Sequence, residues 1–344
     1  MKVCIFGAGA VGGHLAARLG AAGHEVSAVA RGANLAGIRA KGITLHSGGK
    51  TLAARVRASD DPAELGPQDA VFITLKQTAL ASVAASAAAL TDAGTVFVFV
   101  QNGIPWWYAQ GLCAARPRPP DLSALDPGGR LARAFAPQRV VGGAVYSSND
   151  VLEPGVIKNH TPGRNMLVIG APDDSSTERI AALRAMLAAA EIHSPPVPDM
   201  RASVWDKLLI NFGASLCVAI GEPVRALMQD PPLRELRGRL IEEGRAVARA
   251  HGVDVGAAPR RPGGWEQGSG ATDHKPSMLQ DLEIGRPMEV EAILKMPVAF
   301  ARAAGVATPT LDTVVAIVAR LAAAKGLYTS LHAAAEGQAD RPRG

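Results

Sequence analysis

The feature that most constrains the fold is a glycine-rich turn near the start of the chain. Residues 2–6 form a short apolar run typical of buried parallel strands, and residues 11–22 repeat apolar side chains at helical spacing. Between them the pattern G-x-G-x-x-G is formed by Gly7, Ala8, Gly9, Ala10, Val11 and Gly12. The first glycine permits a tight turn, the second lets the backbone approach a pyrophosphate, and the third lets the helix pack on the strand. This context predicts a dinucleotide-binding unit, because the start of the helix offers unpaired N–H groups to an anion.

The rest of the first half continues the alternation of strand and helix. Apolar runs predict strands at 25–30, 70–75, 95–100, 140–146, 155–159 and 166–169, and helical spacing predicts helices at 79–90 and 177–190. A small hairpin-like excursion is expected from 42–45 and 55–58. Alternation of this kind is typical of a parallel, doubly wound sheet, so we expect an α/β fold with an N-terminal Rossmann domain.

The second half carries no strand signals. Three prolines within 194–198 cannot continue a helix or a central strand, and they mark the expected domain boundary. Beyond them, helices are predicted at 203–220, 232–250, from about 278, at 289–304 and at 311–324. We therefore expect a Rossmann domain over 1–198, an all-helical substrate and catalytic domain over 199–335, and a terminal tail over 336–344.

The composition fits an enzyme better than a nucleic-acid-binding protein. The chain has 344 residues and a net charge of +5, and its basic residues are scattered or lie in proline-rich stretches such as 116–120 and 259–262. Nucleic-acid binding is not expected, because it needs a concentrated basic footprint. Anionic small molecules are the expected ligands.

The cysteines and the apolar stretches indicate the cellular compartment in which we expect the protein. Cys4, Cys113 and Cys217 are odd in number, far apart and in no metal-ligand spacing, so neither a disulfide framework nor a metal site is expected. The apolar run 208–220 is too short to span a bilayer and contains Asn211. We expect a cytoplasmic protein that does not enter a membrane.

The end of the second predicted strand carries the residue that would select the cofactor. An NAD-specific unit places Asp or Glu there to bind the ribose 2′-hydroxyl. Here the segment 28–32 contains no acid and has Arg31 at the expected distance. A guanidinium makes forked hydrogen bonds to a 2′-phosphate and complements its charge. The sequence therefore favours NADPH over NADH; the alternative is a surface arginine that closes a loop.

Two further predicted strands also end in polar residues. Lys76 follows Thr74-Leu75, and Asn102 lies between Gln101 and Gly103. Open α/β sheets bind ligands at the carboxyl ends of their strands, so both side chains are candidates to face the nicotinamide ribose and the substrate. The alternative is that they are ordinary solvated residues at strand ends.

A lysine on a strongly apolar helix is the strongest candidate for catalysis. Lys207 and Asn211 are four residues apart and share one helical face, which Ser215 continues. A partly desolvated lysine beside a ketone can donate a proton as hydride arrives, with its pKa lowered toward working pH. The alternative is a lysine that pairs with Asp206 or extends to solvent.

A third cluster follows a loop rich in glycine and proline. Ser277 is placed to bind a substrate carboxylate or, alternatively, to cap the helix that begins at Met278. Glu289 and Glu291 are two residues apart on a helix, so only one of them can face the same site.

Taken together, these motifs resemble those of the ketopantoate reductases over residues 1 to about 325. The resemblance rests on the glycine turn, Arg31, Thr74-Leu75-Lys76, Gln101-Asn102-Gly103, Trp205-Asp206-Lys207 with Asn211, and Ser277-Met278-Leu279-Gln280-Asp281 with Glu289. It implies a two-domain fold with the active site in the cleft and NADPH as hydride donor to a 2-keto acid, and it is compatible with a homodimer.

The resemblance also implies roles for individual residues. Lys207 corresponds to the general acid, and Glu289 joins it in the catalytic group by orienting the keto acid. Asn102, Asn211, Ser215 and Ser277 correspond to the substrate-binding set. Lys76 and Asn102 lie beside the cofactor.

Three segments depart from the family pattern. Ser215 stands where asparagine is frequent, and residues 294–297 replace a usual Asn-Gly or Gly-Ala. Trp106-Trp107-Tyr108 adds bulk near the expected mouth of the cleft, with packing of the loop as the alternative. Reduction of ketopantoate to pantoate is the first hypothesis, followed by reduction of another 2-keto acid and then by a non-catalytic NADP-binding sensor.

Overall fold

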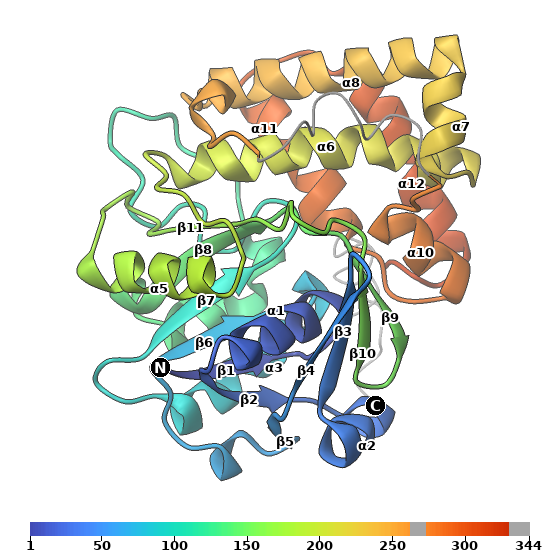
Figure 1. Cartoon of the computed structure of the whole chain (residues 1–344). Helices are drawn as coiled ribbons and strands as arrows, with labels where there is room; N and C mark the ends of the chain where they lie inside the picture. The colour runs from blue at the N-terminus through green and yellow to red at the C-terminus, as the bar shows by residue number, and fades with distance from the viewer. Residues whose placement is uncertain (262–272, 330–344) are drawn as a thin grey trace, which may run out of the picture.

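The computed structural model describes residues 1–261 and 273–329. A seven-stranded sheet occupies the first part, and the helices of the second part gather along one end of it, at the top of the view in Figure 1. A second, four-stranded sheet stands beside the first.

The main sheet has the strand order of a dinucleotide-binding fold. Its parallel strands run β5-β2-β1-β6-β7-β8, and β11 is added antiparallel to β8. In chain order this is the 3-2-1-4-5-6 arrangement of a Rossmann sheet, as predicted. The strands are β1 (Lys2–Phe6), β2 (Glu25–Val29), β5 (Arg57–Ser59), β6 (Ala70–Ile73), β7 (Val96–Val100), β8 (Val140–Val145) and β11 (Leu167–Gly170).

Helices cover both faces of this sheet. They are α1 (Ala10–Ala21), α2 (Gly32–Lys41), α3 (Ala81–Ser86), α4 (Arg130–Ala134) and α5 (Glu178–Ala189). The alanine-rich segment predicted as one helix is shorter than expected, because 3-10 turns replace α-helix on both sides of α3. α1 lies between the main sheet and the second sheet, so both of its sides are buried.

The second sheet corrects one detail of the sequence analysis. Its strands are β3 (Ile43–Ser47), β4 (Lys50–Ala54), β9 (Asn149–Glu153) and β10 (Val156–Asn159), in the order β4-β3-β10-β9. The predicted hairpin exists, but β3 pairs with β4 across Gly48 and Gly49, whereas residues 57–59 belong to the main sheet. Both glycines have positive φ, as in the type I′ turn that is common in two-residue hairpins.

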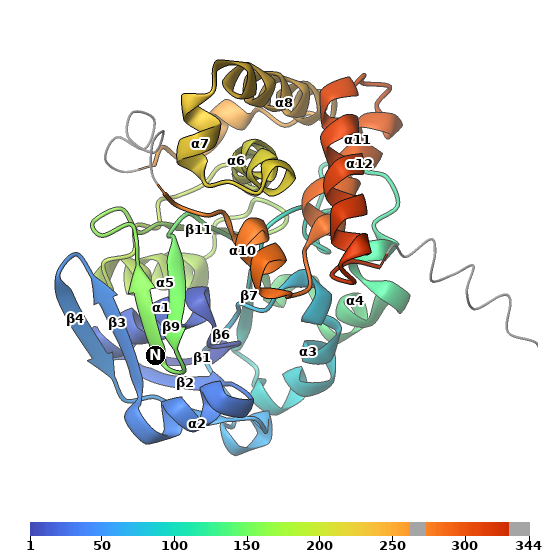
Figure 2. The ribbon, with the colours of Figure 1, turned by 90° about the vertical axis from the view of Figure 1, so that its right-hand side faces the viewer.

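The second part is helical throughout its described residues. After β11 and α5, the prolines of 195–198 lead to Asp199, which caps α6. The helices are α6 (Met200–Ile220), α7 (Val224–Gln229), α8 (Pro231–Ala250), α10 (Ser277–Ile284), α11 (Met296–Ala303) and α12 (Pro309–Ala324), with a π-helical turn at Glu291–Lys295. α6 packs against α8, α10 and α12, and Figure 2 shows α10 between this bundle and the second sheet.

The long helix α6 is a core helix. By length and composition it would pass as a membrane span, with a mean hydropathy of 1.3 over its most apolar window. However, 61% of that window is buried inside the protein, and the helix carries Lys207 and Asn211. Its apolar character is explained by packing against its neighbours on several sides.

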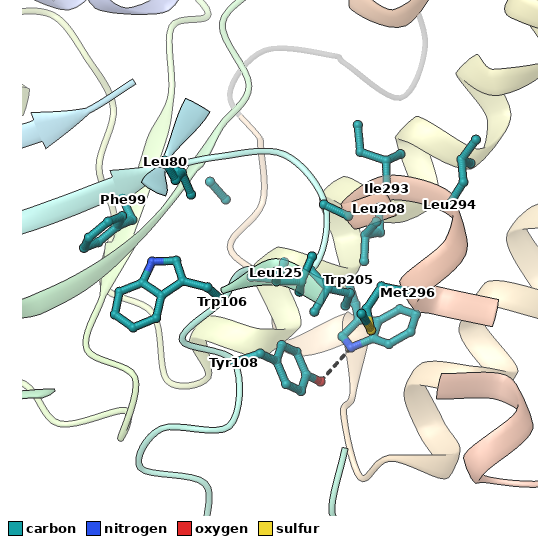
Figure 3. Close-up of a cluster of buried hydrophobic side chains, with 14 of the residues drawn as sticks. Leu80, Phe99, Trp106, Tyr108, Leu125, Trp205, Leu208, Ile293, Leu294 and Met296 are labelled. Carbon is teal, nitrogen blue, oxygen red and sulfur yellow. Dashed lines mark hydrogen bonds between the residues drawn. The ribbon is translucent and has the colours of Figure 1, made fainter. Parts of the chain in front are cut away.

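The apolar core on one face of the main sheet continues into the helical part. Figure 3 shows Phe99 of β7 and Trp106 on one side, with Trp205 and Met296 on the other. Trp106 and Trp107 are 6% and 1% exposed, so they belong to this core. The packing alternative for the Trp106-Trp107 segment is therefore confirmed, and its bulk does not line the mouth of a cleft.

Candidate active site

The glycine turn has the geometry that an anion requires. Gly7 adopts a φ of +104°, and α1 begins at Ala10 with no side chain capping its first turn. A Cβ on Gly12 would lie 2.2 Å from the carbonyl oxygen of Gly7, whereas a Cβ on Gly9 would meet no atom within 4 Å. Gly12 thus permits close packing of helix and strand, and the space beside Gly9 is open. The free N–H groups of the helix start are available for a pyrophosphate.

Arg31 follows β2 and precedes the first turn of α2. Its side chain is exposed and has no hydrogen-bond or ion-pair partner within residues 1–261 and 273–329. Asn34 in the same helix fixes this region to the glycine turn, because its side-chain N–H donates to the carbonyl of Ala8 at 2.7 Å. Arg31 therefore lies next to the glycine turn, and no acid among the described residues forms an ion pair with its guanidinium group.

The carboxyl ends of neighbouring parallel strands bring further polar residues to the same edge. Thr74, after β6, donates through Oγ1 to the carbonyl of Gly7 at 2.6 Å. Asn102 follows β7, and its Oδ1 is buried without a partner in the described part of the chain. Both side-chain amide atoms of Gln101 are buried and unpaired in the same way. Unpaired buried amides are costly unless a ligand or water supplies the missing bonds.

Lys76 bridges the sheet and the helical part. Its Nζ lies 2.5 Å from Oδ2 of Asp281 on α10 and donates to the carbonyl of Pro287 at 3.4 Å. The next residue, Gln77, donates its backbone N–H to Oε1 of Glu289 at 2.9 Å. Two adjacent residues at the end of β6 therefore connect to the segment between α10 and the π-turn.

The two glutamates of that segment have different surroundings. Glu289 is buried, and burial raises the pKa of its carboxyl group, opposed by the hydrogen bond from Gln77 and the charge of Lys76. Glu291 instead accepts a hydrogen bond from the hydroxyl of Tyr328 at 2.6 Å. Glu289 is thus the one that meets the strand ends.

The loop after Asn102 is attached to the π-turn through an unused helix carbonyl. In this turn the N–H of Met296 bonds to Glu291, and the next residue is Pro297, which has no N–H. The carbonyl of Ala292 is therefore left without a helical donor, and Ile104 donates to it at 2.9 Å. A Cβ on Gly103 would lie 2.5 Å from the same carbonyl group, so only glycine allows this approach.

Lys207 lies above an aromatic ring that the sequence analysis did not identify. Its Nζ is 5.4 Å from the ring centroid of Tyr146, the residue that follows β8. The Tyr146 hydroxyl donates to Oδ2 of Asp206 at 2.9 Å and approaches the Ser203 carbonyl at 3.2 Å. The Arg261 guanidinium also lies over this ring, 5.7 Å from its centroid. Tyr146 therefore joins α6 to the carboxyl edge of the sheet.

The surroundings of Lys207 lower the pKa of its ammonium group, as predicted. Desolvation lowers the pKa of Lys207 from 10.5 to about 8; the nearby Arg261 lowers it further and Asp206 opposes the shift. No acceptor within the described residues takes a hydrogen bond from Nζ, so the predicted alternative of an ion pair with Asp206 is not formed. A lysine with this pKa can give up a proton near neutral pH.

The other predicted substrate-binding residues, Asn211, Ser277 and Ser215, lie in different surroundings. Asn211 lies one turn beyond Lys207, and its Nδ2 is buried and unpaired within the described residues. Ser277 is exposed at the first position of α10, and its hydroxyl caps nothing, so the capping alternative is not realised. Ser215 is fully buried and donates to the carbonyl of Phe212 at 2.6 Å. This geometry favours a structural role for Ser215.

His274 begins the cluster that contains Ser277, and the sequence assigns it no role of its own. His274 lies 3.5 Å from the hydroxyl of Ser148, and its ring centroid is 6.5 Å from that of His160. Desolvation lowers the pKa of His274, and the charge of Lys207 contributes to the shift. A single histidine in a loop gives no periodic or spacing signal that could have identified it.

Comparison with known proteins agrees with this arrangement. The family models described as ketopantoate reductase PanE/ApbA and ketopantoate reductase PanE/ApbA C terminal match residues 3–173 and 199–322. The chain is 38% identical to the 2-dehydropantoate 2-reductase of Mesorhizobium japonicum, over 96% of this chain and all of that protein.

Two solved structures share the fold. The 2-dehydropantoate 2-reductase of Geobacter metallireducens superposes with a TM-score of 0.78 at 26% identity, over 93% of this chain and 99% of that one. A dimeric ketopantoate reductase of Staphylococcus aureus has a TM-score of 0.69 at 21% identity, over 95% and 100% of the two chains. With a relative this similar over its whole length and both family models matched, the chain belongs to the ketopantoate reductase family of nicotinamide-dependent oxidoreductases.

Proposed function

We propose that this enzyme reduces 2-dehydropantoate to pantoate with NADPH as the hydride donor. The observation that carries the proposal is the position of Lys207, which is partly buried and lies over Tyr146 at the strand edge that also bears the glycine turn. The similarity to the Mesorhizobium japonicum 2-dehydropantoate 2-reductase supports the choice of substrate.

The residues present fit a nicotinamide dinucleotide. The start of α1, open at Gly9, would receive the pyrophosphate, and Arg31 would pair with the 2′-phosphate of the adenosine ribose. We place Lys76 and Asn102 beside the nicotinamide half, since they follow the next two strands along the edge. When bound, NADPH supplies a hydride.

Lys207 is the proposed general acid. As a ketone carbon is reduced, negative charge develops on its oxygen, and a nearby ammonium group stabilises that charge and then transfers its proton. The Tyr146 ring fixes the ammonium by a cation–π contact that needs no acceptor oxygen. The Nζ protons therefore remain available for the substrate oxygen.

The neighbouring polar groups are the proposed substrate contacts. The unpaired amides of Asn102 and Asn211 and the exposed hydroxyl of Ser277 supply donors and acceptors for a carboxylate, a ketone and a hydroxyl. Glu289 orients the substrate while its other oxygen holds the backbone at Gln77. Ser215 supports the helix from within, rather than contacting substrate.

The choice of substrate predicts a clear order of turnover. Ketopantoate should have the highest kcat/KM in a panel with pyruvate, phenylglyoxylate and trimethylpyruvate, which is ketopantoate without its hydroxyl group. A site that hydrogen-bonds this hydroxyl should favour ketopantoate over trimethylpyruvate by at least about tenfold. The measurement is the loss of NADPH absorbance with each acid. A higher kcat/KM for phenylglyoxylate would instead assign the enzyme to another, bulkier 2-keto acid.

Replacement of Arg31 tests the proposed cofactor. Arg31→Ala should raise the Kd for NADPH by about 10- to 100-fold, because it removes a charge-assisted contact of about 1.5–3 kcal/mol. The Kd for NADH should not change, since NADH has no 2′-phosphate. Lys41→Ala, at the other end of α2, is the matched control and should leave both values unchanged. Titration by NADPH fluorescence measures them, and equal affinity of the parent enzyme for the two cofactors would refute the role of Arg31.

We also propose a domain boundary, an oligomeric state and a cellular location. The domain boundary lies between 198 and 199, just before the cap of α6, and the tail 336–344 lies outside the described residues. A homodimer is proposed by analogy with the Staphylococcus aureus enzyme, whose structure is described as dimeric. A cytosolic location agrees with three cysteines that are all free.

A further inference from the structure

We infer that Arg201 is a positioning residue that ties the helix of Lys207 to the loop of Asn102. This inference rests on the proposed role of Lys207 as the general acid. Arg201 is in the first turn of α6 and is 1% exposed. A charged side chain this deeply buried requires a compensating set of partners.

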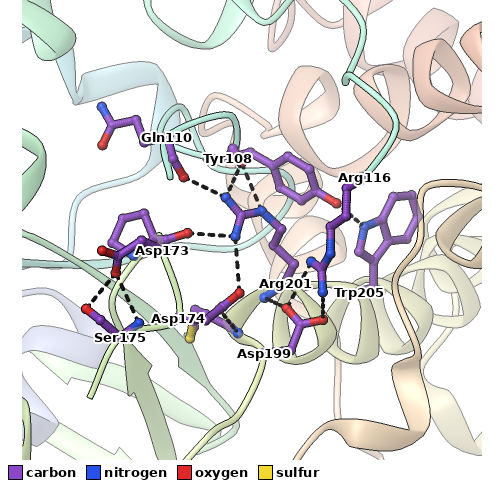
Figure 4. A network of polar contacts seen from close by, with 11 residues as sticks. Tyr108, Gln110, Arg116, Asp173, Asp174, Ser175, Asp199, Arg201 and Trp205 are labelled. Carbon is purple, nitrogen blue, oxygen red and sulfur yellow. Dashed lines mark hydrogen bonds and ion pairs between the residues drawn. The ribbon is translucent and has the colours of Figure 1, made fainter. Parts of the chain in front are cut away.

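The partners of Arg201 are mainly backbone carbonyls. Its Nε and Nη2 donate to the Tyr108 carbonyl at 3.1 and 2.8 Å, Nη2 donates to Gln110 at 2.7 Å, and Nη1 donates to Pro172 at 2.7 Å. Asp174, the nearest acid, is 3.7 Å away. Figure 4 shows the guanidinium enclosed by these groups. The planar fork of arginine reaches three carbonyls at once, which a lysine cannot do.

Tyr108 is held at both of its ends by the same helix. Its carbonyl accepts from Arg201, and its hydroxyl accepts from Nε1 of Trp205 at 2.8 Å. Arg201 and Trp205 are four residues apart and share one face of α6. Two attachment points, one turn apart, fix both the rotation and the axial position of the helix.

A second tyrosine holds the helix further along. Tyr146 bonds to Ser203 and Asp206 and carries Lys207 over its ring. Since Lys207 is six residues beyond Arg201, a small rotation of α6 displaces its ammonium group directly. A misplacement of about 1 Å can lower an enzymatic rate about 100-fold.

The same contacts connect the two sides of the active site. The loop that contains Tyr108 and Gln110 begins directly after Asn102 and is attached to the π-turn at Ile104. Arg201 therefore fixes the relative position of Asn102 and Lys207. Asp199, the cap of α6, adds an ion pair to Arg116 at 2.7 Å, so the start of the helix is held from two sides.

The test compares Arg201→Lys with the same change at another buried arginine. Arg201→Lys should lower kcat about 10- to 100-fold and move the alkaline limb of the kcat profile to higher pH, while the Kd for NADPH changes less than about twofold. Arg18→Lys is the control, because Arg18 is 5% exposed and donates to His14 of α1, to Ser47 of the second sheet and to Glu191 after α5. It should lower the melting temperature but leave kcat at saturating NADPH and its pH profile unchanged.

The outcomes separate the inference from the proposed function. If Lys207→Ala loses activity but Arg201→Lys loses only thermal stability, as Arg18→Lys does, the positioning role is wrong and the general acid stands. If Lys207→Ala keeps its kcat, the proposed acid itself is wrong. Should Arg201→Lys fail to fold, Tyr108→Phe removes only the acceptor of Trp205 and should lower kcat several-fold with the same shift in pH profile. Because Arg201 and Trp205 both hold α6 through Tyr108, an unchanged kcat and pH profile in Tyr108→Phe would show that this attachment does not position Lys207, and it would overturn the inference.

Discussion

Replacement of Lys207 by alanine should lower kcat by about two to four orders of magnitude, the range expected for loss of a general acid. The ammonium group acts on charge that develops only as hydride is transferred, so its removal should affect kcat more than KM. The Kd for NADPH should hardly change, because Lys207 lies over Tyr146 at the end of β8, away from the glycine turn after β1. Steady-state kinetics and cofactor titration measure the three quantities.

The pH dependence provides a second signature of Lys207. Since desolvation lowers its pKa to about 8, the protonated acid predominates below that pH and is lost above it. The kcat/KM of the parent enzyme should therefore be level below pH 8 and fall about tenfold per pH unit well above it, because kcat/KM reports the pKa of the free enzyme. This alkaline limb should be absent from the residual activity of Lys207→Ala.

A control variant separates chemistry from stability. Lys207→Arg keeps the charge over the Tyr146 ring but has a pKa too high to transfer its proton readily, so it should fold normally and remain slow. A Lys207→Ala enzyme with normal kcat and a lowered melting temperature would show that the lysine is structural. The acid would then have to be sought at Lys76.

The parts of the site that lie at strand ends could be predicted from the sequence. Parallel strands share a carboxyl edge, so once β1, β2, β6 and β7 were recognised from their apolar runs, Arg31, Lys76 and Asn102 were expected at one side of the sheet. Lys207 could be predicted because a lysine among apolar helix residues is rare enough to need a reason.

Other parts could not be predicted, because they depend on contacts between distant segments. Tyr146 ends an apolar strand and resembles any core aromatic until α6 is placed above it. The pairing of Lys76 with Asp281 joins residues more than two hundred positions apart. Ser215 shows the limit of helical spacing, which placed it on the face of Lys207: its buried hydroxyl donates to the Phe212 carbonyl, and this contact favours a structural role.

A pair of glycine variants should separate the two requirements of the cofactor turn. Gly12→Ala places a methyl group 2.2 Å from the Gly7 carbonyl oxygen and 2.5 Å from Oγ1 of Thr74, and neither backbone nor strand end can move away cheaply. Gly12→Ala should therefore lose thermal stability and bind NADPH at least about 100-fold more weakly, because the start of α1 is displaced from β1.

Gly9→Ala is expected to behave differently. Its methyl group meets no protein atom within 4 Å, and the φ of Gly9 is −78°, so no left-handed backbone conformation opposes alanine. The fold should thus keep its melting temperature, while the methyl group occupies space that the pyrophosphate needs beside the helix start. NADPH affinity should fall about as far as in Gly12→Ala without the loss of stability. Differential scanning fluorimetry and NADPH titration measure the two effects, and a Gly9→Ala protein with parental affinity would place the pyrophosphate away from this turn.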